Sequence, residues 1–65
     1  MEKIVGTAYS KTTQINYQVK WDKSCGDVWI KDPDKVGWML VAKEAITAED
    51  ALTLAQEVID EQEMY

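Results

Sequence analysis

The sequence predicts an α+β fold: a four-stranded antiparallel meander with one C-terminal α-helix packed on one face. Three observations predict it. Residues 13–21 alternate between apolar and polar side chains, short apolar runs are separated by turn-forming residues, and residues 47–63 carry an apolar stripe of helical spacing. A chain of 65 residues is long enough for one small core, so we expect residues 1–65 to form a single domain.

Residues 3–9 predict the first strand, in which Gly6 marks a bulge or a close approach of another part of the chain. Residues 13–21 predict the second strand, because their period of two is typical of a half-buried antiparallel strand. The apolar members of that alternation are Ile15, Tyr17, Val19 and Trp21. These side chains define the face of the sheet that we expect to be buried.

Two turns separate the remaining strands. Residues 23–26 predict a hairpin turn that ends in a glycine, and residues 27–31 predict the third strand. Residues 32–35 predict a second turn, because Pro33 occupies a position that favours its fixed φ. Residues 37–43 predict the fourth strand.

The helix is predicted to begin after Thr47, whose hydroxyl can cap the first turn, with Asp50 completing a variant of the capping box. The apolar stripe consists of Ala48, Ala51, Leu52, Ala55, Val58 and Ile59. Acidic residues without a neighbouring lysine occupy the last turn, at the negative end of the helix dipole, so we expect that turn to fray.

The length of the loop around Cys25 decides which side chains of the third strand face the core, because a shift of one residue reverses both faces. An even loop buries Val28 and Ile30 and places Trp29 outside, beside Lys20. An odd loop does the opposite. The glycine that ends the loop favours the odd length, whereas burial of two β-branched residues favours the even one, which we adopt.

An even loop in the next hairpin places Trp29 opposite Leu40 and Lys31 opposite Trp38. The face under the helix then holds Val28, Ile30, Met39 and Val41. A second apolar face is left, and one helix cannot cover both. Three alternatives remain for this second face. The ends of the chain cover it, through Tyr9, Met64 or Tyr65; it is left in solvent without a role; or it contacts another molecule.

The last alternative predicts a protein-binding surface, since contiguous apolar patches mark interaction sites and tryptophan is enriched in binding hot spots. We expect the partner to be another protein or a second copy in a homodimer. The residues predicted to form this surface are Trp29, Trp38, Leu40, Lys20 and Lys31.

The composition argues against several other functions. The chain lacks histidine and arginine, the commonest general base and the residue suited to bidentate phosphate recognition. We therefore expect no enzyme, no catalytic residues, no cofactor and no metal site. A pI of about 4.4 argues against nucleic-acid binding. One cysteine, no apolar run of membrane length and no leader-like N-terminus predict a cytoplasmic protein.

Charge is distributed unevenly along the chain. Residues 1–43 hold seven lysines and five acids, a net charge of +2, whereas residues 44–65 hold seven acids and no base, a net charge of −7. Such a run usually serves solubility. It also allows an alternative function, an acidic inhibitor that mimics nucleic acid through Glu57, Asp60 and Glu61.

The strands followed by ITAEDALTLAQEVIDEQ resemble the layout of small HicB-type antitoxins, in which a Thr-capped acidic helix follows the sheet. The resemblance is one of architecture and of an A-D-A-L-type start of the helix. It implies an antitoxin-like regulator and transfers no site residues.

Overall fold

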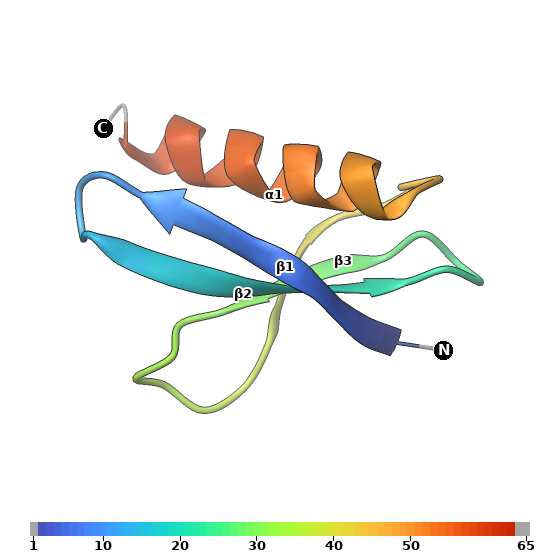
Figure 1. Cartoon of the computed structure of the whole chain (residues 1–65), viewed down its shortest axis with the longest axis horizontal. Coiled ribbons are helices and arrows are strands. Elements are labelled where there is room, and N and C mark those ends of the chain that lie inside the picture. The colour runs from blue at the N-terminus through green and yellow to red at the C-terminus, as the bar shows by residue number, and fades with distance from the viewer. Residues whose placement is uncertain (1, 64–65) are drawn as a thin grey trace.

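The computed structural model describes residues 2–63 and confirms the predicted fold class: one antiparallel sheet and one helix (Figure 1). The elements are β1 (Glu2–Ser10), β2 (Ile15–Asp22), β3 (Val28–Lys31), β4 (Met39–Ala42) and α1 (Ala48–Glu63). The strands lie in the order β1-β2-β3-β4, so each strand pairs with its neighbour in the chain. No helix among residues 2–63 is long and apolar enough to cross a membrane.

Strands β2 and β4 begin later than predicted because the turns before them are longer. The turn after β1 includes residues 11–14, with Gln14 at a φ of 58° and its amide donating to the Ser10 carbonyl over 2.8 Å. The loop after β3 continues to Trp38, because Gly37 has a φ of 98° and interrupts the extended backbone. Strands β2 and β4 therefore begin two residues later than the sequence pattern indicates.

Gly6 combines both of the features predicted for it. The register between β1 and β2 shifts between Ile4 and Gly6, which leaves Val5 as the extra residue of a β-bulge. A Cβ atom on Gly6 would lie 2.9 Å from a terminal carbon of Leu52. The helix therefore packs directly on the backbone of β1 at this position.

The pairing of β2 with β3 confirms the even loop. Val19 lies opposite Ile30, and Lys20 lies opposite Trp29. The Asp22 amide donates to the Asp27 carbonyl over 3.0 Å, which closes a loop of residues 23–26. The glycine at the end of this loop has a φ of 79°, so its conformational freedom is used in the even loop as well.

The pairing of β3 with β4 confirms Trp29 opposite Leu40 and corrects the predicted inner face. Ile30 lies opposite Met39, but a register shift then aligns Val28 with Ala42. Val41 still packs against the core, whereas Met39 is 52% exposed. Met39 thus lies on the predicted inner face, at the start of β4, but it is largely exposed, so its predicted burial under the helix is wrong.

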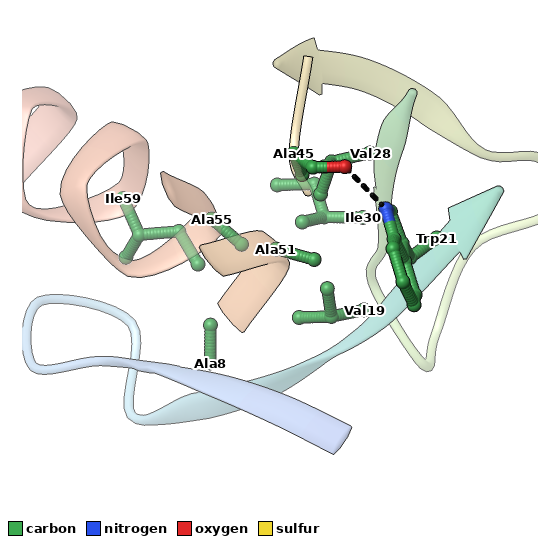
Figure 2. Packing of buried hydrophobic residues seen from close by; sticks show 9 residues of the cluster. All are labelled: Ala8, Val19, Trp21, Val28, Ile30, Ala45, Ala51, Ala55 and Ile59. Carbon is green, nitrogen blue, oxygen red and sulfur yellow. Dashed lines mark hydrogen bonds between the residues drawn. The ribbon is translucent and has the colours of Figure 1, made fainter. Parts of the chain in front are cut away.

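The core lies between α1 and one face of the sheet (Figure 2). Small side chains line the helix side, which allows the helix to lie close to the strands. The buried apolar residues are Ala8, Val19, Trp21, Val28, Ile30, Ala45, Ala51, Ala55 and Ile59. The indole nitrogen Nε1 of Trp21 donates to the Ala45 carbonyl over 3.0 Å, which fixes the segment that leads into the helix. The predicted cap is present, because Asp50 donates its amide to Thr47 Oγ1.

Candidate protein-binding face

The face of the sheet opposite α1 carries a row of paired side chains that crosses all four strands. Ile4 lies opposite Lys20, Lys20 opposite Trp29, and Trp29 opposite Leu40. Directly opposed residues in an antiparallel sheet point to the same face and contact each other. The two ends of the row are the most open, with Ile4 55% and Leu40 45% exposed, while Trp29 is half-buried.

Trp38 joins this row from the end of the loop between β3 and β4. The Lys20 ammonium lies 4.5 Å from the centre of the Trp38 ring and 5.0 Å from the centre of the Trp29 ring. Both distances are within the range of a cation–π interaction. One lysine therefore holds two tryptophan rings in fixed positions on the sheet.

Glu2 neutralises the charge at the centre of this arrangement. Its Oε1 atom lies 2.6 Å from Lys20 Nζ, and the lysine side chain is only 17% exposed. The ion pair satisfies the ammonium within the chain, so Lys20 offers little net charge to a partner. We call Glu2, Ile4, Lys20, Trp29, Trp38 and Leu40 the aromatic face.

The structure thus brings together four of the five residues predicted for this surface: Lys20, Trp29, Trp38 and Leu40. Lys31 lies opposite Gln18, two residues beyond Trp29 on the same face of the sheet, and borders the aromatic face. Sequence reasoning missed Glu2 and Ile4. The register between the first two strands would have placed Ile4 beside Lys20, but the bulge at Val5 hides that register in the sequence.

The segments proposed as a cover for this face provide none within the described residues. Tyr9 is exposed and lies opposite Asn16, at the other end of β1 from Ile4. Met64 and Tyr65 lie outside the described residues. Within residues 2–63, α1 is the single helix and packs on the opposite face, so the aromatic face is open to solvent.

The acidic residues of α1 form a separate surface. Glu57, Asp60 and Glu61 are exposed, and the last turn contains no basic residue. Asp60 is partly engaged within the helix, because its Oδ1 atom accepts a hydrogen bond of 3.0 Å from Gln56 Nε2. The helix therefore presents carboxylates on its last two turns.

A cleft of about 600 Å³ opens between the turn after β1, the loop after β3 and the end of α1. Both apolar and hydroxyl-bearing side chains line it. Its lining residues are Ser10, Thr12, Thr13, Tyr17, Ile30, Asp32, Lys35, Val36, Gly37, Trp38, Met39 and Ile59. The charged members are one carboxylate and one ammonium, so the lining favours neither sign of charge.

The exposed Cys25 is poorly suited to nucleophilic chemistry. The Asp27 amide lowers the pKa of its thiol, but partial desolvation and the carboxylates of Asp27 and Asp22 outweigh this effect and raise the pKa above its ordinary value. The thiol is therefore protonated at neutral pH, whereas the thiolate is the reactive form. In residues 2–63 no three potential acidic or cysteine ligands gather closely enough to hold a metal ion.

Comparison of the chain with protein-family models, with curated protein sequences and with solved structures finds no match.

Proposed function

We propose that this protein is a non-enzymatic interaction module that binds a protein, another chain or a second copy, through its aromatic face. The observation that carries the proposal is the row of Ile4, Trp29 and Leu40 across an uncovered sheet face, while the single helix of the described chain buries the opposite face. Exposed apolar patches of this kind mark binding surfaces, and tryptophan contributes strongly to binding energy.

The ion pair at the centre of the face supports binding in a second way. Because Lys20 contacts both indole rings and Glu2, the rings are ordered before a partner arrives. Ordering side chains during association costs about 0.5–1.5 kcal/mol for each mobile side chain, so this preorganisation favours binding. With Lys20 neutralised, we expect an apolar partner surface and an affinity that depends weakly on salt.

Substitution of Trp29 by alanine tests the proposal. A partner is first isolated with the wild-type chain and purified, and its affinity is then measured by calorimetry for the variant. Trp29→Ala is expected to remain folded and to lower the affinity at least tenfold, as removal of a hot-spot tryptophan does. The matched control is Tyr9→Ala, which removes an exposed aromatic ring at the other end of β1 and is expected to bind as the wild type does. Equal binding by Trp29→Ala would refute the proposal.

The acidic end of α1 supports a second candidate, an inhibitor or antitoxin-like regulator that mimics nucleic acid. The specific observation is that Glu57, Asp60 and Glu61 are all exposed, with no basic residue in the last turn. Reversing Glu57 and Glu61 to lysine would then abolish binding with little loss of stability. Binding through these carboxylates would also weaken steeply between low and high salt, which separates this function from the first.

Nucleic acid is a poorer candidate as the ligand of the aromatic face. Stacking of bases on tryptophan is normally combined with free lysines or arginines that contact the phosphates. Here the central lysine is already paired with Glu2 and placed against both rings. The net charge of −5 adds a general repulsion of phosphates.

A further inference from the structure

β1 lies at one edge of the sheet and, with nine residues, is longer than the four-residue β4 at the other edge. A long edge strand presents a row of amide and carbonyl groups with which a strand of another chain can pair. β4 is short, and a register shift against β3 leaves Val41 as an extra residue within it. The edge that most needs protection from another strand is therefore that of β1.

The first half of the β1 edge is interrupted in two ways. Glu2 and Lys3 are charged and exposed, and charged side chains on an edge strand oppose the addition of another strand. The bulge at Val5 then shifts the outward-pointing backbone groups by one residue, so an incoming strand cannot follow the edge past it. Residues 6–10, beyond the bulge, carry neither a charge nor a register shift. This second half is the part of the edge that requires another form of protection.

In this second half, the side-chain amide of Gln56 bonds to both backbone groups of Tyr9. The Oε1 atom accepts from the Tyr9 amide over 3.0 Å, and the Nε2 atom donates to the Tyr9 carbonyl over 2.8 Å. A residue of a neighbouring antiparallel strand would make the same two bonds, because residues of a hydrogen-bonded pair exchange both. A primary amide carries the same acceptor and donor as a peptide group. Gln56 thus takes the place of a residue in the next strand.

The amide of Gln56 is held in place by contacts on both sides of it along α1. Its Nε2 atom also donates to Asp60 Oδ1 over 3.0 Å. An ionised carboxylate accepts hydrogen bonds and does not donate them, so Asp60 requires the nitrogen of the amide on its side. One turn earlier, Leu52 packs over Gly6, where a Cβ atom would lie 2.9 Å from a terminal carbon of the leucine. The missing side chain at Gly6 allows α1 to run close to β1, which brings Gln56 within reach of Tyr9 (Figure 1).

We propose that Gln56 is an edge clamp, which occupies the pairing groups of Tyr9 and so keeps β1 from pairing with a strand of another chain. Within residues 6–10, Thr7 is the other residue whose backbone groups point outward, because these directions alternate along a strand. With Tyr9 occupied, Thr7 alone is left, and one residue is too short for a strand ladder. The clamp is an autoinhibitory contact of the docked helix. It concerns the edge of β1 and stands independently of the proposed function, which concerns the face of the sheet.

Hydrogen exchange of the Tyr9 amide in dilute solution tests the clamp itself. Gln56→Ala is expected to keep its helix by circular dichroism, because alanine favours the helix and the lost side chain is only half-buried. The Tyr9 amide of this variant is expected to exchange at least about tenfold faster than in the wild type, since its hydrogen-bond acceptor is removed. The matched control is Thr53→Ala, which shortens an exposed side chain of α1 and is expected to leave the exchange rate unchanged. An unchanged rate in Gln56→Ala would overturn the proposal.

Light scattering of the full chain over a range of concentrations tests the consequence of the clamp. Gln56→Ala is expected to reach a larger mass than the wild type and Thr53→Ala at the same concentration. As its mass rises, the Thr7 amide is expected to gain protection from exchange, because an added strand would bond to it. Equal masses at all concentrations, or a larger mass without protection of Thr7, would overturn the proposal. So would a larger mass that disappears in the double variant with Trp29→Ala, since the new contact would then lie on the aromatic face.

Discussion

Substitution of Trp29 and of Trp21 by alanine should have very different effects on stability, although the two residues belong to neighbouring strands of the same sheet. Trp29 is half-buried on the open face, where it contacts Lys20 and lies opposite Leu40. Its removal forfeits the cation–π contact with Lys20, about 0.5–2 kcal/mol, and the cross-strand pair with Leu40, about 0.2–1 kcal/mol. No enclosed cavity forms, so we expect a total loss of about 1–3 kcal/mol.

Trp21 is 5% exposed in the core, and its indole donates to the buried Ala45 carbonyl. Truncation of a buried tryptophan costs about 3–5 kcal/mol. The carbonyl left without its donor adds about 1–3 kcal/mol. A domain of this length has a total stability of about 3–10 kcal/mol, so Trp21→Ala is expected to unfold at 25 °C while Trp29→Ala remains folded.

Urea unfolding followed by far-ultraviolet circular dichroism measures both changes, because the signal of α1 reports the folded state. Trp29→Ala is expected to give a cooperative transition at a lower midpoint with an unchanged slope. If Trp29→Ala lost as much stability as Trp21→Ala, Trp29 would belong to the core, and the assignment of an open face would be refuted.

Three further predictions concern the connections. Gly26→Ala should lower the free energy of unfolding by more than about 3 kcal/mol, because the added Cβ would lie 2.8 Å from the backbone of the segment before α1. Gly37→Ala places its Cβ where no atom lies within 4 Å, so it should cost only about 1–2 kcal/mol, from its positive φ. Equal losses of stability by the two variants in thermal unfolding would contradict this difference. Thr47→Ala removes the helix cap and should cost about 0.5–2 kcal/mol in urea unfolding, and no loss would show that the cap contributes nothing. The Ser24 hydroxyl holds the pKa of Asp22 well below its usual range, so this carboxylate stabilises the fold above its ordinary pKa and loses that effect as the pH falls. Ser24→Ala should therefore raise the pKa of Asp22 toward its ordinary value in an NMR titration. An unchanged pKa would exclude the hydroxyl as the cause.

The sequence predicts the position of Trp29 because burial of two β-branched neighbours outweighs the cost of one exposed ring. The clear alternation of the second strand fixes the inner face, and the loop then follows from pairing. The sequence does not predict the contact of Trp38 with Lys20, because Gly37 lengthens the loop before it. It does not predict Glu2 either, since the bulge at Val5 shifts the register. Patterns of period two locate strands and faces, whereas bulges and positive φ values decide which residues meet.

The most direct test of the central claim is the affinity of folded Trp29→Ala for a protein that the wild-type chain binds. The account predicts that the variant keeps its helix and a cooperative unfolding transition but loses at least tenfold in affinity, while reversal of Glu57 and Glu61 leaves binding unchanged. Full affinity in Trp29→Ala, with binding lost on the charge reversal, would contradict the aromatic face as the binding surface and assign that role to the acidic helix.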